Sequence, residues 1–386
     1  VPLRLVLVRH GLSSYNIEQR IQGRDDLSSL TAEGVEQAAR AGAALAEIPF
    51  QAAYCSPLRR AADTATQLLA AHGGGVTATP SDNLLEIDLE PWSGLLRQEL
   101  AERFPAEERL WREAPHQLEL VRGDGSRYAP VPELMEQAGR FLDQLLERHG
   151  TADGSVLVVA HNGILRCLIL SLLGLQAEGF SRLRVDNAGI SVFNVDQGGD
   201  QRQVQIESLN GTAHLGAGLP SRRRGPRLLL VRHGETDWNR QGRFQGQIDI
   251  PLNANGHRQA EAAAAFLADV PLSRAYTSAM ARPRQTAERI LAAHPGVPLT
   301  STMGLLEIGH GLWEGRLEQE IAEGWPQLLA DWKRAPETVQ MPEGETIQQV
   351  WERSLATWHR IAASLAAEET ALVVAHDAVN KTILCA

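Results

Sequence analysis

The chain has little cysteine, with only three residues of this type in 386. So sparse and odd a number does not suit a disulfide framework, and it fits a reducing compartment better than an oxidising one. We therefore expect Cys55, Cys167 and Cys385 to be small core residues. The amino terminus shows no charged region followed by an apolar stretch and a cleavage site, so we expect no signal peptide and a cytoplasmic protein.

Long hydrophobic runs are also missing. The most apolar stretch, 156–175, contains His161, Asn162 and Arg166, so a strand followed by a helix explains it better than a membrane span. A net charge of −10 argues against binding to nucleic acids or to anionic membranes in general. No lysine-containing phosphate loop or dinucleotide glycine motif stands in a suitable context, and the histidines have no metal-ligand spacing. We expect neither a cofactor nor a metal.

What the sequence does contain is an internal repeat. Arg-His-Gly follows a short apolar run at His10 and again at His233, 223 residues later, and each copy has an asparagine six residues after the histidine. Further landmarks recur in the same order with little drift, which indicates a duplicated domain. The paired landmarks are Gly23 with Gly246, Gly34 with Gly256, Arg60 with Arg282, Glu86 with Glu307, Trp92 with Trp313, and His161 with His376.

The repeat defines the expected domains. The amino-terminal domain spans 1–210, the linker 211–226, and the carboxy-terminal domain 227–386. The linker contains Gly, Ser and Pro, and its basic run 222–224 fits a solvated segment better than a site for an acidic partner. The second copy stops inside the helix expected after His376, so we expect the closing strands of that domain to be absent.

Strand patterns alternate with helical patterns in the first copy, which predicts a mostly parallel sheet covered by helices on both faces. Thr31 is the expected N-cap of one helix, and Ser56 followed by Pro57 the start of the next. Because ligands bind at the carboxyl ends of such strands, His10 and His161 should meet at one site. The expected strands are 3–9, 53–55, 155–160, 190–195 and 203–208, and the expected helices are 31–47, 56 onward, 132–149 and 163–173.

These motifs together resemble the histidine phosphatase superfamily in its phosphoglycerate-mutase-like branch. The resemblance rests on Arg-His-Gly with its downstream Asn, on Ser-x3-Arg-x3-Thr-Ala from Ser56 and from Ser278, on Leu-Glu-Ile before Trp-x-Gly, and on Val-Ala-His. The resemblance covers nearly the whole chain, because the motifs occur in both copies. It implies an α/β fold with two copies of a three-layer α/β/α domain whose sheet is mostly parallel.

The resemblance also implies an enzyme that forms a phosphohistidine. A neutral imidazole can attack phosphorus, and arginine matches the charge that spreads over the phosphoryl oxygens. His10 and His233 would be the nucleophiles, and a glutamic acid of raised pKa would protonate the leaving oxygen. The implied catalytic residues are His10, Glu86, His161, His233, Glu307 and His376. The implied phosphate-binding residues are Arg9, Asn16, Arg60, Arg232, Asn239 and Arg282.

Several alternatives stay open at this point. Asn16 and Asn239 could simply cap local turns. Pro283 disfavours helical geometry at Arg282, so that helix could start later than its counterpart. The first copy has Leu12 where the family usually carries Glu, so the second copy is the surer catalyst and one copy could be a non-catalytic sensor of a phosphorylated ligand.

The expected reaction is metal-independent hydrolysis of a small phosphorylated metabolite, with a cofactor-dependent phosphoglycerate mutase as the alternative. The intervals between the paired histidines, 151 and 143 residues, are compact for the extra segments of a mutase. Candidate substrates are phosphoserine, α-ribazole phosphate, phosphoglycerates and sugar phosphates. Specificity is expected to lie in the segments 104–130 and 323–345, and the sequence leaves the oligomeric state open.

Overall fold

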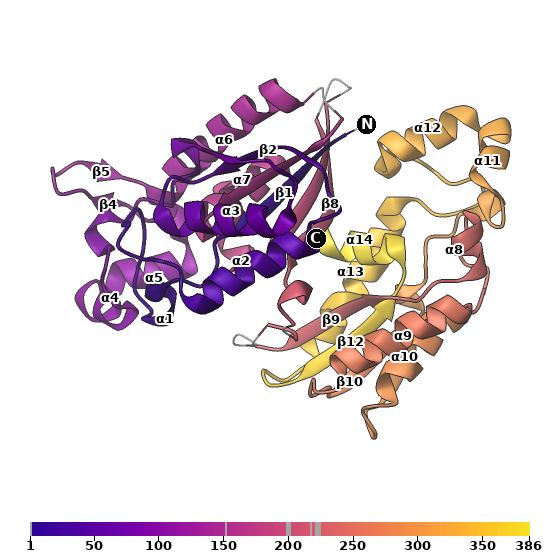
Figure 1. The fold of residues 1–386 in the computed structure, drawn as a ribbon. Coiled ribbons are helices and arrows are strands. Elements are labelled where there is room, and N and C mark those ends of the chain that lie inside the picture. Colours follow the sequence, from indigo (N-terminus) through magenta and orange to yellow (C-terminus); the bar gives the residue numbers. More distant parts are fainter. Residues whose placement is uncertain (1, 151–152, 198–201, 217, 221–224) are drawn as a thin grey trace. The chain divides into compact units, whose positions relative to one another are not determined.

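The structure, a computed structural model, describes residues 2–150, 153–197, 202–216, 218–220 and 225–386. It separates into two compact units, Val1–Ala217 and Gly218–Ala386, each with its own sheet and its own hydrophobic clusters (Figure 1). The basic run 222–224 of the predicted linker lies outside the described residues. Each unit is described by itself below.

The first unit is built on a six-stranded sheet with the order β3-β2-β6-β1-β7-β8. Neighbours from β3 to β1 are parallel, while β7 pairs antiparallel with β1 and β8 pairs antiparallel with β7. The expected α/β fold with a mostly parallel sheet is confirmed. The strands are β1 (Leu3–Arg9), β2 (Phe50–Cys55), β3 (Ala78–Pro80), β6 (Ser155–Ala160), β7 (Ile190–Asp196) and β8 (Gln203–Gly211), with a small hairpin of β4 (Leu120–Val121) and β5 (Arg127–Tyr128).

Helices cover both faces of this sheet because successive residues of its central strands point to opposite faces. In β1, Leu3, Leu5 and Leu7 join the cluster under α6 and α7, whereas Val6 and Val8 join the cluster under α2 and α3 (Figure 1). Every residue of β6 is buried, as expected for a strand with helices on both sides. The helices are α1 (Ser14–Ile17), α2 (Ala32–Ala44), α3 (Arg59–His72), α4 (Arg97–Arg103), α5 (Pro105–Glu113), α6 (Pro130–His149) and α7 (Asn162–Leu172).

One expectation about a helix start was wrong, and one open alternative about a helix start is excluded. The helix expected from Ser56 begins at Arg59 instead, and the Ser56 hydroxyl, which accepts from Leu58 N, also contacts His161 in the site described below. The corresponding helix of the second unit does not start late, since α10 (Ala281–Leu291) begins at the residue equivalent to Arg59. Pro283 is tolerated because the N–H groups of the first helical turn have no intrahelical acceptor to lose. The expected N-cap Thr31 is confirmed, and its side chain accepts from Gly34 N.

The second unit repeats the parallel core in a four-stranded sheet with the order β11-β10-β12-β9. Among the described residues β9 has a neighbouring strand on one side only, and no strand follows α14. The strands are β9 (Arg227–Arg232), β10 (Arg274–Ser278), β11 (Leu299–Thr302) and β12 (Thr370–Ala375). The remaining helices are α8 (Asp237–Gln241), α9 (Ala254–Leu267), α11 (Glu318–Gly324), α12 (Pro326–Arg334), α13 (Ile347–Ala363) and α14 (Asp377–Leu384).

The cysteines divide differently from the expectation. Cys55 and Cys167 are buried, but Cys385 is exposed, one residue beyond the end of α14, where no core covers it. In the part of the chain that the structure describes, no helix combines the length and the apolar composition needed to span a bilayer.

Candidate active site

Both units bring two histidines together at the carboxyl ends of adjacent parallel strands. His10 follows β1 and His161 follows β6, and these strands pair in register up to Arg9 and Ala160. The two imidazole centroids lie 5.2 Å apart, and those of His233 and His376 are also 5.2 Å apart. All four side chains are buried. The predicted meeting of His10 with His161 is therefore what the fold produces, in duplicate.

The first histidine of each pair has a defined tautomer. Nδ1 of His10 lies 2.8 Å from Gly11 O, and Nδ1 of His233 lies 2.7 Å from Gly234 O. A carbonyl oxygen can only accept, so Nδ1 must carry the hydrogen in the neutral ring. Nε2 is then left with its lone pair, which is the form that can act as a nucleophile.

The second histidine has the opposite arrangement because of a serine. Nε2 of His161 lies 2.7 Å from Ser56 Oγ, and Nε2 of His376 lies 2.9 Å from Ser278 Oγ. Ser56 Oγ accepts from Leu58 N, and among the described residues Nε2 of His161 is the one acceptor that its O–H contacts; when the hydroxyl donates there, Nδ1 of His161 carries the hydrogen. Nδ1 of both rings is buried and finds no partner among the described residues. This N–H can donate to a bound phosphoryl oxygen.

Burial keeps these rings neutral. Desolvation, followed by nearby arginines, lowers the pKa of His10 well below its usual 6.5, and burial lowers the pKa of His233 to about 3. The pKa values of His161 and His376 are also well below the usual value, again mainly through burial. Charging a ring away from water costs free energy, and the adjacent guanidinium groups add repulsion.

Arg60 and Arg282 are held by the backbone beside the nucleophiles. In Arg60, Nη1 donates to Asp25 O and Nη2 donates to Gly23 O, at 2.7 and 2.8 Å. Arg282 makes the equivalent bonds, and its Nε lies 3.3 Å from Nε2 of His233. Both guanidinium groups are almost fully buried, so their positive charge is concentrated where an anion would sit.

Arg9 and Arg232 differ between the units. Arg9 donates through Nη1 to Val185 O at 2.8 Å, and burial lowers its pKa to about 10. Arg232 is exposed and forms an ion pair with Asp377, with 3.2 Å between Nη1 and Oδ1. The equivalent of Asp377 in the first unit is Asn162, which carries no charge. In the first unit the carboxylate that acts on this arginine comes from Asp186 instead.

The glutamates lie against the helix that follows the second histidine. Glu86 accepts from Gly163 N and Ile164 N, both at 3.1 Å. Glu307 accepts from Ala378 N, at 3.4 Å. A side chain at Gly163 would place its Cβ 2.5 Å from Glu86 Oε1, so the alanine at the equivalent position 378 accounts for the looser contact. Burial raises the pKa of Glu307, which favours a protonated carboxyl group.

The asparagines act as local caps in this structure. Asn16 Oδ1 accepts from Ser13 N and Ser13 Oγ, and Asn239 Oδ1 accepts from Thr236 N and Thr236 Oγ. Asn187, which the sequence reasoning did not select, donates to Asn16 Oδ1 and to the carbonyl oxygens of His10 and Gly11. It lies in the loop before β7, where no sequence pattern identified it.

The glycine of Arg-His-Gly is required by a close approach. A Cβ on Gly11 would lie 2.3 Å from Gly34 O, and one on Gly234 would lie 2.4 Å from Gly256 O. Gly11 N donates to Thr64 Oγ1 at 3.0 Å, and the hydroxyl of Thr64 donates to Arg60 O. The three motif segments are thus joined directly, which explains the spacing of Ser-x3-Arg-x3-Thr.

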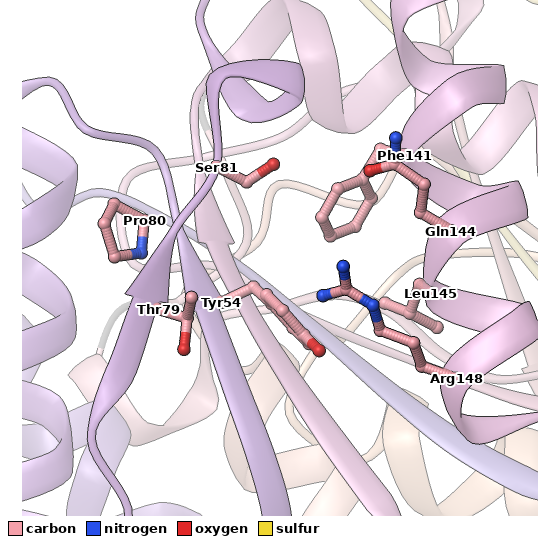
Figure 2. Close-up of a pocket in the computed structure, with 8 residues that line it drawn as sticks. All are labelled: Tyr54, Thr79, Pro80, Ser81, Phe141, Gln144, Leu145 and Arg148. Carbon is pink, nitrogen blue, oxygen red and sulfur yellow. The ribbon is translucent and has the colours of Figure 1, made fainter.

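A separate cavity of about 260 Å³ opens between β2, β3 and α6 of the first unit. Tyr54, Phe141 and Arg148 are among its lining residues (Figure 2). None of the predicted site residues lines it. Within the described ranges, no group of three or more His, Cys, Asp or Glu side chains could hold a metal ion.

Comparison with known proteins identifies the family. Residues 5–207 and 228–386 match the histidine phosphatase superfamily (branch 1), so the chain belongs to this superfamily and contains its domain twice. It is therefore an enzyme of the histidine phosphatase type, and the predicted three-layer α/β/α fold of the phosphoglycerate-mutase-like branch is confirmed.

Named relatives support the same class. A 2-carboxy-D-arabinitol-1-phosphatase of Triticum aestivum is 31% identical over 407 residues, covering 99% of this chain and 77% of the wheat protein. Phosphoserine phosphatase 1 of Hydrogenobacter thermophilus is 32% identical over 214 residues, covering 55% of this chain and 95% of that protein. The solved structure of YhfR from Bacillus stearothermophilus has a TM-score of 0.50 at 25% identity, covering 55% of this chain and 99% of that one.

Proposed function

We propose that the chain is a metal-independent phosphomonoesterase of small metabolites that works through a phosphohistidine. The observation that carries the proposal is the pair of buried imidazoles in each site, one with Nδ1 on a carbonyl oxygen and the other with Nε2 on a serine hydroxyl. The bond from Nδ1 of His10 to Gly11 O leaves Nε2 with a lone pair, while the Ser56 hydroxyl leaves Nδ1–H of His161 as a donor. A nucleophile and a donor thus stand side by side, next to a buried guanidinium.

In the first step, Nε2 attacks the phosphorus and the bond to the ester oxygen breaks. The arginines and the second histidine donate to the phosphoryl oxygens, where charge develops. Glu86 or Glu307, as a carboxylic acid, gives its proton to the leaving oxygen. In the second step, the resulting carboxylate takes a proton from water, which attacks phosphorus and releases phosphate and the imidazole.

We infer that both copies carry out this reaction. Leu12 replaces a glutamate, but its backbone N–H donates to Gln37 at 2.9 Å just as that of Glu235 donates to Gln259 at 2.8 Å. The Glu235 carboxylate binds Asn253, the N-cap of α9. The substitution therefore changes a contact with the helix cap and leaves the geometry of His10 intact.

For the substrate, sugar-acid phosphates come first, because the wheat relative named for such a compound matches across both copies. Phosphoserine comes second, through the relative that matches one copy. Phosphoglycerates, α-ribazole phosphate and simple sugar phosphates complete the set. The segments 104–130 and 323–345, which include α5 and α12, are the proposed specificity elements. We place the enzyme in the cytoplasm.

The test is hydrolysis of 4-nitrophenyl phosphate in a chelator by the full chain, followed by a screen of these esters. The single variants His10→Ala and His233→Ala should each lower turnover, and the double variant should lose it. Activity that survives in the double variant contradicts the proposal. An isomerised ester without free phosphate identifies a mutase, and unchanged turnover in His10→Ala with retained phosphate binding identifies a sensor in the first copy.

A further inference from the structure

The backbone that carries each proposed acid belongs to no strand or helix. Glu307 lies between the short 3-10 helices Met303–Leu305 and Gly311–Trp313, and Glu86 lies between Asp82–Leu84 and Glu90–Trp92. Such a segment has no ladder of backbone hydrogen bonds to fix its position, so side chains must satisfy its carbonyl groups.

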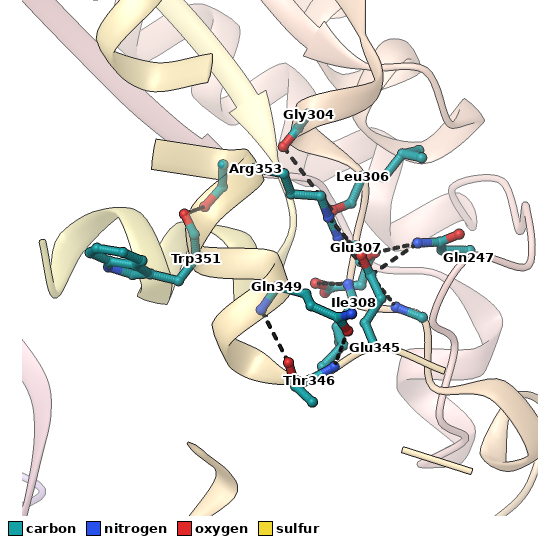
Figure 3. A network of polar contacts seen from close by, with 12 residues as sticks. Gln247, Gly304, Leu306, Glu307, Ile308, Glu345, Thr346, Gln349, Trp351 and Arg353 are labelled. Carbon is teal, nitrogen blue, oxygen red and sulfur yellow. Dashed lines mark hydrogen bonds and ion pairs between the residues drawn. The ribbon is translucent and has the colours of Figure 1, made fainter. Parts of the chain in front are cut away.

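In the second unit this is done by Arg353 of α13. Its Nη1 donates to Gly304 O and Leu306 O at 3.2 and 2.6 Å, and its Nη2 donates to Glu307 O at 3.0 Å. Figure 3 shows Arg353 lying against this segment. One planar group thus holds three carbonyl acceptors around the acid, which suits the fixed fork of a guanidinium.

Two further residues complete the arrangement. Glu345 pairs with Arg353 at 2.8 Å through both carboxylate oxygens and accepts from Gly309 N at 2.8 Å. Gln247 donates through Nε2 to Glu307 O at 3.0 Å and to Glu345 Oε2 at 3.2 Å (Figure 3). The backbone carbonyl of Glu307 therefore accepts two hydrogen bonds, one from Arg353 and one from Gln247.

The first unit holds Glu86 with the same residue types in exchanged positions. Gln137 of α6 donates to Asn83 O and Leu85 O at 3.2 and 2.8 Å, the acceptors equivalent to those of Arg353. Arg24, which occupies the position of Gln247, donates to Glu86 O at 3.0 Å and to Gln137 Oε1 at 2.9 Å. Here the arginine and the glutamine contact each other directly.

We propose that this exchanged Arg–Gln pair positions the proton-donating carboxyl group of each site. Arg24 with Gln137 places Glu86, and Gln247 with Arg353, joined by Glu345, places Glu307. These are positioning residues, because they bind the peptide of the acid and not the reacting atoms. The inference rests on the proposed role of the two glutamates as acids.

Each glutamate is held at two points, its side-chain carboxyl group and its backbone carbonyl group, so the position of its peptide affects the position of its carboxyl group. The carboxyl group is fixed by the amide groups that open α7 or α14, while the carbonyl is fixed by the Arg–Gln pair. A shift of the peptide moves the carboxyl group relative to the leaving oxygen, and a misplacement of about 1 Å costs roughly a hundredfold in rate.

The test uses the full chain with His10→Ala, so that only the second site turns over, and compares two esters. 4-Nitrophenolate leaves without a proton, whereas the alkoxide of 2-glycerol phosphate needs one. We expect Arg353→Gln to lower kcat/KM, which reports only the steps up to release of the alcohol, by about 10- to 100-fold on 2-glycerol phosphate and by less than about threefold on 4-nitrophenyl phosphate. An equal loss on both esters, or no loss, overturns the proposal.

Exchanging the glutamine and the arginine between their two positions provides a rescue experiment. Gln247→Arg added to Arg353→Gln recreates the arrangement of the first unit, and it should restore kcat/KM on 2-glycerol phosphate to within about threefold of the parent. Arg360→Gln is the matched control, because Arg360 lies on the same helix and donates to Thr357. A folded double variant without recovery contradicts the pairing.

A second readout needs no turnover. Amide hydrogen exchange at Ile308 and Gly309 should quicken by at least about tenfold in Arg353→Gln and return in the double variant. If the His10→Ala parent hydrolyses neither ester, the proposed function of the second site fails. The exchange measurement still decides whether the Arg–Gln pair holds the peptide of Glu307. Unchanged exchange in Arg353→Gln overturns it regardless of activity.

Discussion

Nε of Arg282 lies 3.3 Å from Nε2 of His233, so a guanidinium donates to the one ring nitrogen that keeps a lone pair. Burial of the ring, and to a smaller extent the charge of Arg282, keep His233 neutral, with its pKa lowered to about 3. We expect nitrogen NMR of labelled histidine to show neutral Nδ1–H rings for His10 and His233 from pH 7.5 down to pH 5. The signals of the two rings are assigned by their loss in His10→Ala and in His233→Ala. Titration of either ring near pH 6.5 contradicts the prediction.

The same depressed pKa makes the second unit sensitive to acid. The unfolded chain binds a proton at His233 below about pH 6.5, while the folded ring stays neutral down to about pH 3. Stability from this group is therefore complete above pH 6.5 and is lost as the pH falls towards 3. Urea unfolding of the second unit should show a midpoint that rises with pH in this window, less steeply in His233→Phe.

Ser56 should control the rate through the tautomer of His161. Removing its hydroxyl in Ser56→Ala frees Nε2 to take the hydrogen, so Nδ1 loses its N–H towards the phosphoryl group. In a His233→Ala background we expect kcat on 4-nitrophenyl phosphate to fall by about 10- to 100-fold, the cost of one hydrogen bond to a charged group. Ser56→Thr keeps the hydroxyl and should retain most of the rate. Equal rates in the alanine and threonine variants would show that the hydroxyl has no such role.

The raised pKa of Glu307 should define the alkaline side of the pH profile. In a His10→Ala chain, kcat on 2-glycerol phosphate should fall as the pH rises through the pKa of Glu307, because the proton donor is lost. Ala378→Gly removes the Cβ that keeps the helix amides away, so the pKa should fall and the limb should move to lower pH. Ala378→Ser keeps the Cβ and should leave the limb in place. If the fall of kcat at high pH persists in Glu307→Gln, the titration of another group causes it.

Asp377 should weaken anion binding in the second site. Its carboxylate pairs with Arg232 at 3.2 Å and with Lys381 at 2.7 Å, so it offsets positive charge next to His233. In a His10→Ala chain we expect Asp377→Asn to lower the inhibition constant for inorganic phosphate by about fivefold, as a partly exposed ion pair is worth up to about 1 kcal/mol. Asp377→Glu keeps the charge and should change little. Weaker phosphate binding in Asp377→Asn would mean that the carboxylate orders the site instead.

Gly11 should tolerate no side chain. Gly11→Ala places a Cβ 2.3 Å from Gly34 O, and we expect it to lower the free energy of unfolding of the first unit by about 1–3 kcal/mol. Gly139→Ala is the control, since that glycine lies inside α6 with nothing within 4 Å of an added Cβ, and it should be neutral or stabilising by up to about 1 kcal/mol. Equal stability of the two variants would show that the close approach can relax without cost.

The sequence was sufficient for the sheet and for the meeting of the paired histidines, since apolar runs ending in Arg-His and Ala-His place His10 and His161 on neighbouring strands. The helix start predicted at Ser56 was wrong, because Ser-Pro marks a helix cap only where the local sequence determines the structure. The hydroxyl instead binds His161, 105 residues further along the chain, which only the tertiary fold brings near. Gln137 and Arg353 were not selected for a similar reason, because a polar residue on a long helix looks solvated until the segment carrying the acid packs against it.

The exchanged positions of arginine and glutamine have an evolutionary consequence. Two similar copies in one gene are exposed to recombination that overwrites part of one copy with the other. A tract that covers Arg24 but not Gln137 would produce two glutamines around Glu86, and the reciprocal tract would produce two arginines around Glu307. Partial homogenisation would therefore damage either site, and the two halves of this gene should diverge together or be converted whole.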